Sequence, residues 1–393
     1  MCKGQTAPTY TRLIDAACRG MLYRRRNSPQ STIELITVTG HRVDHDMKIW
    51  LLAGCLLFCV MNLGAQDTDA PSTHAGYVPV ISGAVGYVDS ISGGTPTLLP
   101  AIDPVLLVPI GSHILGEARG EFVGAFSRRN GNGDYTGQVF SELDYAQIDW
   151  LADTHVMAVG GKYLIPYGLV SERLDPIWIE TFQNLPLTYS IGLQTSGFGV
   201  GGELRGVAVE NNKYSIQYSA YYSAHSDKYQ FAASRATGFD SSIYFSPQHL
   251  EIGTSYQRYL DDPRNVNSEA TYVSWQPPQI PLDFKAEWDH GYYGQGYWIE
   301  ADYMLSQVPV ANRFFKNVQV AGRMQQSFPD HGGGHGVPGI QTERPGVALN
   351  YYIRDNWRII SSYERNFTST KDTNLWNVGF TYRFVWPAWP GRK

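Results

Sequence analysis

Charged residues recur at every second position in several parts of this chain. The sets are Glu117, Arg119 and Glu121; Glu203 and Arg205; and Lys285, Glu287 and Asp289. Because successive side chains of a β-strand point to opposite faces, this spacing places the charges of each set on one face. Carboxylates and cations gathered on one wet face can filter ions and polar solutes by charge. The chemistry that this pattern predicts is therefore selection of solutes.

Residues suited to bond-making or metal binding follow no such pattern. The chain has no GxSxG motif, and His155, His225, His249 and His290 are scattered. Asp289 and His290 are adjacent, so in a strand they would face opposite sides. His331 and His335, with Asp330 beside them, could bind a metal, but the three glycines between the histidines favour a mobile loop. We expect no enzyme activity, no catalytic residue, no metal and no cofactor.

The elements that must position the charges are strands, and Leu375–Phe384 is the clearest of them. Trp376, Val378, Phe380, Tyr382 and Phe384 alternate with Asn377, Gly379, Thr381 and Arg383. One face is thus apolar and the other wet, over about the ten residues that a tilted strand needs to cross a bilayer. The same alternation of apolar and polar residues recurs in roughly 14 segments of the chain. It predicts an all-β, transmembrane antiparallel barrel of about 16 strands, with 14 to 18 allowed.

A soluble β-sandwich or propeller would also alternate, and three features argue against it. The apolar faces are rich in aromatics, no blade motif repeats, and the start of the chain carries an export signal. Met47-Lys48, an apolar core and Leu63-Gly64-Ala65 have the layout of a secretory signal peptide at 47–65. Residues 1–46 then form an upstream extension from a start site assigned too early. The alternatives are a genuine leader, or lipidation at Leu52–Cys55.

Removal of residues 1–65 would change the composition. All four cysteines lie before this point, so the remainder has no disulfide or thiol chemistry. Residues 1–65 hold eight of the 31 basic and four of the 36 acidic residues, which leaves 23 basic and 32 acidic residues, a net charge of −9. A nucleic-acid binder would need a basic face, so nucleic acid is excluded as a partner.

The N-terminal part of the exported chain is harder to assign. Residues 66–110 include Pro96, Pro100, Pro104 and Pro109, which interrupt strand pairing. This segment is expected to be a lead-in, a first part of the barrel or a plug inside it. The barrel itself is expected at 111–386, followed by a C-terminal tail at 387–393.

The stretch from Gly160 to Gly202 resembles the phosphate-selective porin family. The resemblance covers about 40 residues, and the matching positions are Gly161, Lys162, Pro166, Tyr167, Gly168, Ile179, Glu180 and Gly192. It implies a 16-stranded, often trimeric diffusion pore of the bacterial outer membrane, in which one long loop folds inward and narrows the channel. Leu169–Thr188 is the segment expected to be that loop, which places Glu172, Arg173, Asp175 and Glu180 near the constriction.

The charge pattern departs from phosphate selectivity, which calls for rings of Lys or Arg with few acids. Here acids and bases share the wet face, so general or cation-leaning diffusion is the better expectation. The residues expected to line the pore are Glu117, Arg119, Glu121, Lys162, Glu172, Arg173, Asp175, Glu180, Glu203, Arg205, Lys285, Glu287 and Arg323.

The function expected is passive diffusion of small hydrophilic solutes or ions through a water-filled barrel. Its partners would be those solutes, outer-membrane lipid and, by the resemblance, two further copies of the chain. An alternative is a transporter of hydrophobic substrates such as long-chain fatty acids, with residues 77–109 as its plug. An outer-membrane barrel enzyme is the weaker third interpretation. The solute, its charge, the exact strand number and the oligomeric state stay open.

Overall fold

The computed structural model describes residues 79–128, 134–171, 180–192, 197–224, 235–260, 266–308, 312–331 and 337–387. The expected extension, signal peptide and C-terminal tail beyond Pro387 lie outside these ranges, as do Glu172, Arg173 and Asp175. Within the described residues no helix is both long enough and apolar enough to cross a membrane.

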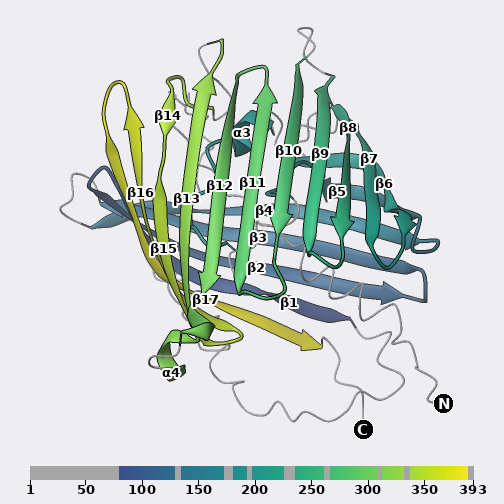
Figure 1. The fold of residues 1–393 in the computed structure, drawn as a ribbon, viewed down its shortest axis with the longest axis horizontal. Coiled ribbons are helices and arrows are strands. Elements are labelled where there is room, and N and C mark those ends of the chain that lie inside the picture. The colour runs from purple at the N-terminus through teal and green to yellow at the C-terminus, as the bar shows by residue number, and fades with distance from the viewer. Residues whose placement is uncertain are drawn as a thin grey trace, which may run out of the picture. The chain divides into compact units, whose positions relative to one another are not determined.

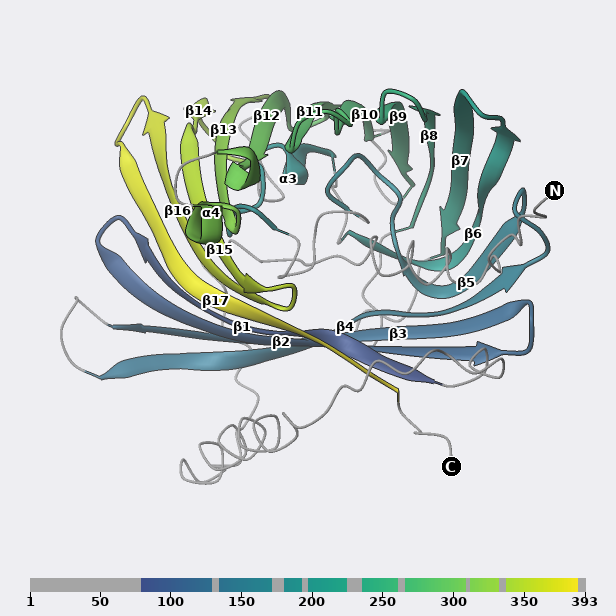
Figure 2. The same ribbon diagram turned by 60° about the horizontal axis from the view of Figure 1, so that its bottom comes forward.

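One antiparallel sheet of seventeen strands closes on itself (Figures 1 and 2). The strands are β1 (Val80–Ser92), β2 (Thr95–Ile110), β3 (Ile114–Arg128), β4 (Tyr135–Leu151), β5 (Met157–Leu164), β6 (Phe198–Glu210), β7 (Tyr214–Ser223), β8 (Ala236–Phe245), β9 (Leu250–Tyr259), β10 (Asn267–Trp275), β11 (Leu282–Gly291), β12 (Gly294–Met304), β13 (Val318–Pro329), β14 (Thr342–Glu343), β15 (Gly346–Arg354), β16 (Trp357–Thr368) and β17 (Thr373–Pro387). The short helices are α3 (Tyr189–Gly192), η3 (Leu305–Gln307) and α4 (Asn312–Phe315).

The order of the strands follows the chain, and β17 pairs with β1 to close the barrel. Strands β14 and β15 occupy one position, because each of them pairs with both β13 and β16. Seventeen strands therefore fill sixteen positions, as the sequence predicted. Closure leaves the sheet without the two free edges that an open sheet would expose to lipid.

The faces of the wall alternate as predicted. On β17, Trp376 and Val378 are 51% and 54% exposed. Asn377, which lies between them, and Thr381, farther along the strand, are buried. The same outward parity carries exposed apolar side chains around the whole barrel, among them Leu106, Phe122, Ile148, Leu204, Tyr222, Phe239, Ile252, Trp288, Ile299, Val320, Leu349 and Ile359. A continuous apolar belt of this kind is what a barrel embedded in lipid presents.

Connections differ between the two ends of the barrel. At one end, called the turn end, β1 begins, β17 ends, and six of the seven connections are short: 111–113, 152–156, 211–213, 246–249, 276–281 and 355–356. The seventh spans 305–317. The opposite end, called the loop end, has the longest connection of the chain, 165–197 between β5 and β6. Short turns at one end and longer loops at the other are typical of outer-membrane barrels.

The prediction that the barrel starts at residue 111 is wrong. Of the two alternatives left open for 77–109, a first part of the barrel or a plug, the described residues form the first part of the barrel. Strand β1 pairs along its whole length with both β17 and β2, so the wall begins at Val80. Strand β2 accommodates its prolines because Pro100 and Pro104 lie four residues apart and share one parity. Pairing with β1 is continuous there, whereas pairing with β3 skips 99–100 and 103–104. Prolines that interrupt the ladder toward one neighbour alone are compatible with a strand.

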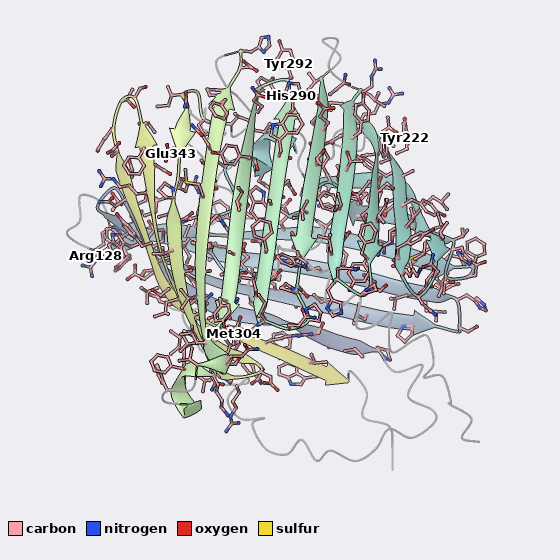
Figure 3. All side chains as sticks on the ribbon, in the orientation of Figure 1. Arg128, Tyr222, His290, Tyr292, Met304 and Glu343 are labelled. Atoms are coloured by element: carbon pink, nitrogen blue, oxygen red, sulfur yellow. The ribbon has the colours of Figure 1, made fainter. Side chains whose placement is uncertain are left out.

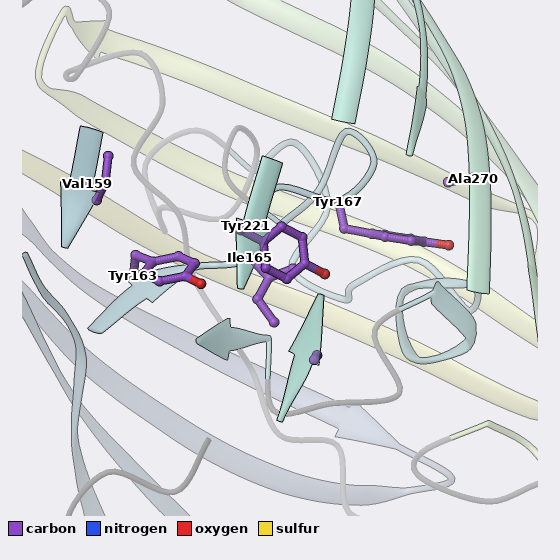
Figure 4. Close-up of a cluster of buried hydrophobic side chains, with 7 residues drawn as sticks. Val159, Tyr163, Ile165, Tyr167, Tyr221 and Ala270 are labelled. Atoms are coloured by element: carbon purple, nitrogen blue, oxygen red, sulfur yellow. The ribbon is translucent and has the colours of Figure 1, made fainter. Parts of the chain in front are cut away.

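Inward-facing tyrosines fill the space beside glycines of neighbouring strands. The rings of Tyr163, Tyr221 and Tyr272 lie where a Cβ atom would be on Gly199, Gly238 and Gly253 respectively. Tyr163 and Tyr221 belong to a buried cluster with Val159, Ile165, Tyr167, Ala236 and Ala270, which joins the wall to the chain that leaves β5 (Figure 4). This cluster fixes the point at which the long connection turns into the barrel.

Candidate functional site: an inward loop and charged clusters in the lumen

The connection between β5 and β6 folds into the barrel, as predicted for Leu169–Thr188. We call its described parts, 165–171 and 180–192, the inward loop. It leaves β5 and lies against inward-facing side chains of β9 to β16, with α3 packed against β10, β11 and β12 (Figure 2). Most of its side chains are buried, including Ile165, Phe182 and Thr188.

The first half of the inward loop is attached to β9 and β11. The backbone N–H of Gly168 donates to the Ser255 hydroxyl at 2.9 Å, and the next N–H, of Leu169, donates to the Glu287 carboxylate. Leu169 and Val170 then pack with Tyr272 and Trp298 of the wall. A carboxylate that accepts a backbone N–H forms a charge-assisted bond, which is stronger than a neutral one.

The second half of the inward loop is attached to four further strands. Its contacts are Thr181 Oγ1 to Asp302 at 2.9 Å, Leu187 N–H to Gln325 at 2.8 Å, the Asn350 amide to the Thr181 carbonyl at 3.1 Å, Ser362 Oγ to Gln183 at 2.8 Å, and the Asn184 amide to Glu364. All these groups are buried, so each hydrogen bond that is lost would leave an unsatisfied polar atom.

Arg323 of β13 is the centre of this attachment. Its guanidinium bonds to Glu300 at 2.6 Å and donates at 2.7 Å to the carbonyl of Asn184 in the inward loop. It also lies over the ring of Phe182, 4.3 Å from the ring centroid. A planar guanidinium can serve an acid, a carbonyl and an aromatic face at once. Arg323 therefore joins the wall to the loop by three different interactions.

Lys285 of β11 lies among three carboxylates of the wall. Its ammonium is 2.8 Å from Asp283, 2.9 Å from Asp302 and 3.4 Å from Glu300. Register explains the arrangement, because Lys285 is directly opposite Glu300, and Glu300 is directly opposite Arg323. A cavity of about 30 Å³ beneath the inward loop is bordered by Lys285, Glu300, Arg323 and Glu180. That volume has room for one or two water molecules.

Two smaller clusters lie on the part of the wall nearest the N-terminus. Arg119 is fully buried, 3.1 Å from Asp144 and 3.7 Å from Asp103. A register shift between β3 and β4 makes Asp144 an extra residue of β4, which brings it within reach of Arg119. In the second cluster, Arg205 is 3.3 Å from Asp149 and 3.8 Å from Glu203.

The structure thus places the predicted pore residues in different surroundings. Arg119 and Glu121 lie inside on β3, with Glu117 on the same parity; Glu203 and Arg205 lie inside on β6, and Lys285, Glu287 and Arg323 face the inward loop. Lys162 lies on the parity opposite to that of the inward-facing Val159 and Tyr163, so the prediction that it lines the pore is wrong. Its ammonium donates to the Leu143 carbonyl at 2.5 Å and lies 3.7 Å from the centroid of the Phe198 ring.

Sequence reasoning missed the partners that hold these residues. Asp103 was hidden in the proline-rich stretch, and Glu300, Asp302 and Glu364 belong to strands recognised without their polar members. Parity alone could have found Asp103, Glu300 and Asp302, since each of them lies between apolar residues of the opposite parity. Which acid pairs with which base depends on the register between neighbouring strands, and the sequence alone does not give that register. No group of three or more metal-ligating side chains occurs in the part of the chain that the structure describes.

No known protein family and no curated protein matches this chain. Solved structures do. The chain is similar to OmpF of Salmonella typhi in complex with daunomycin, with 13% identity, a TM-score of 0.54, and coverage of 79% of this chain and 98% of that one. It is also similar to OmpT, an outer-membrane protein of Vibrio cholerae, with 8% identity, a TM-score of 0.51, and coverage of 80% and 100%. At these identities the likeness shows the fold: the chain has the 16-stranded barrel of outer-membrane porins.

Proposed function

We propose that this protein is an outer-membrane channel for passive diffusion of small hydrophilic solutes or ions. The observation that carries the proposal is the inward loop, attached to β9, β11, β12, β13, β15 and β16 across a barrel whose inner face is polar and charged. A loop held in this position narrows the lumen and sets the size of the solutes that pass. Diffusion down a gradient needs no energy source, no cofactor and no enzyme activity.

The charge preference of the channel follows from the charged side chains on the inner face of the barrel wall. Among the described residues, inward-facing carboxylates, such as Asp103, Glu121, Asp144, Asp149, Glu203, Asp240, Glu287, Asp289, Glu300, Asp302 and Glu364, outnumber inward-facing bases. Opposite charges across a narrow lumen also create a transverse field that orders water. We therefore propose general diffusion with a preference for cations, and we do not carry over phosphate selectivity from the resemblance.

Planar-bilayer recording of the purified protein tests this directly. We expect stepwise single-channel conductance and, in a KCl gradient, a reversal potential that indicates K⁺ permeability above Cl⁻ permeability. Anion preference with block by phosphate would instead support a phosphate-selective channel. A folded, heat-modifiable barrel without conductance would contradict the channel and favour a hydrophobic-substrate transporter.

Neutralising Glu121 and Glu142 together is expected to lower the preference for cations. The two carboxylates are directly opposite each other on β3 and β4, so their mutual repulsion ends when both become glutamine. The variant should therefore fold at least as well as the wild type, with a K⁺ to Cl⁻ permeability ratio closer to one. Glu269→Gln is the matched control, since this exposed residue lies on the outward face of β10, 3.5 Å from His290. An unchanged ratio in the double variant would remove these acids from the ion path.

We further propose that the barrel assembles as a homotrimer through the wall formed by β2 to β5. This wall has an outer groove of about 410 Å³, bordered by Leu106 and Ile148 and floored by small residues such as Gly116, Ala118 and Gly160. On the loop-end side of this groove, residues 136–143 of β4 are exposed on both faces, because β5 pairs only with Ala146–Leu151 of β4. Mass measurement of the detergent-extracted protein should give three copies, and Gly160→Trp should give one. A single copy in the wild type would contradict the assembly.

A further inference from the structure

The 305–317 connection stands apart from the other connections at the turn end. Those contain two to six residues, whereas this one holds η3 and α4 and reaches beyond the ends of β12 and β13. Figure 3 places Met304, where the connection begins, at the end of the barrel opposite His290 and Tyr292. The connection is fastened to the wall, because the N–H of Tyr352 donates to the Asn317 carbonyl at 2.9 Å.

Phe314 extends the apolar belt of the barrel at this end. It is 56% exposed, and its ring stacks on that of Tyr351 with 5.0 Å between centroids and 21° between planes. Tyr351 shares the outward parity of β15 with Leu349 and Ile353, which are 55% and 50% exposed. Phe314 therefore lies on the lipid side of the wall, at the level where the strands end.

The charge of the same connection has one sign. Between Tyr303 and Asn317 the sequence contains Arg313 and Lys316 and neither Asp nor Glu. Lys316 is exposed and follows Phe315, whose ring meets that of Phe314 edge to face at 5.6 Å. In a bilayer, aromatic rings favour the edge of the hydrocarbon core, and basic side chains favour the lipid phosphate groups next to it. Phe314 and Lys316 together therefore match the boundary between acyl chains and phosphate groups.

We propose that Phe314 and Lys316 of this connection bind an anionic phospholipid of the leaflet at the turn end. Phe314 lies against its glycerol and upper acyl carbons, and Lys316 contacts its phosphate. Two observations select this occupant: the exposed aromatic is continuous with the lipid-facing belt, and the connection is basic without a compensating acid. The site is outside the barrel and does not depend on the proposed function, so solute permeation is expected to be the same with the site empty.

Native mass spectrometry of the detergent-solubilised barrel, titrated with dioleoyl phosphatidylglycerol or dioleoyl phosphatidylcholine, tests the proposal. We expect the wild type to bind the anionic lipid more tightly, by about fivefold for each basic residue at the surface. Lys316→Gln should reduce affinity for the anionic lipid by about fivefold and leave the neutral lipid unchanged. Phe314→Ala should weaken the binding of both lipids, because its ring contacts the part that they share.

Lys213→Gln is the matched control, because Lys213 is an exposed lysine in a tight turn at the same end. Its affinities should equal those of the wild type. Equal affinity of the wild type for the two lipids would overturn the proposal. So would an affinity for the anionic lipid that Lys316→Gln leaves unchanged, while heat modification on a gel shows the variant to be folded.

Discussion

Replacing Arg323 with alanine is expected to lower the free energy of unfolding by about 3–5 kcal/mol, because it leaves the buried Glu300 without its strongest partner. The same change removes the hydrogen bond to the Asn184 carbonyl and the contact with the Phe182 ring. The inward loop should then move more freely, so single-channel conductance should rise. Denaturant unfolding in micelles and planar-bilayer recording measure the two effects.

The matched control is Arg365→Ala. Arg365 also pairs with an aspartate, Asp372, at 2.8 Å, but both side chains are more than 40% exposed at the loop end. Exposed pairs of this kind contribute about 0–1 kcal/mol, so stability and conductance should both stay near wild-type values. Loss of stability without a change in conductance for Arg323→Ala would mean that the loop does not narrow the pore.

Replacing Gly253 with alanine is expected to destabilise the barrel by about 1–3 kcal/mol or to prevent its assembly, because the new methyl group overlaps the ring of Tyr272. That ring has little freedom to move. Its hydroxyl donates to Asp240 at 3.0 Å, and its face packs against Leu169 and Val170 of the inward loop. The midpoint of heat modification on a gel and the yield of folded barrel report the effect.

Gly322→Ala is the control for this second substitution, because a Cβ atom at Gly322 would meet open space. Its midpoint should match that of the wild type. The double variant Gly253→Ala/Tyr272→Ala separates overlap from backbone effects. If the ring causes the loss, adding Gly253→Ala to Tyr272→Ala should cost much less than adding it to the wild type. An equal cost in both backgrounds would contradict the overlap.

The sequence by itself determined the architecture of this protein, because a strand in a barrel wall is a local pattern. Alternation in segments such as Leu375–Phe384 identifies the face toward lipid, and the number of such segments approximates the number of strands. The long stretch without alternation after Leu164 identified the connection that folds inward. These inferences need only the period of a strand and the length that crosses a bilayer.

Only the tertiary structure decided which residues meet. From the sequence, prolines spaced four apart were expected to interrupt strand pairing. In the barrel, Pro100 and Pro104 interrupt the pairing of β2 with β3 but not its pairing with β1, and this outcome depends on which strands flank β2. Lys285 and Arg323 are 38 residues apart and share Glu300 because registers on both sides of β12 align them. The attachment of the inward loop likewise depends on strands distant in the sequence, such as β16. Parity is encoded residue by residue, whereas register and loop placement follow from closure of the whole barrel.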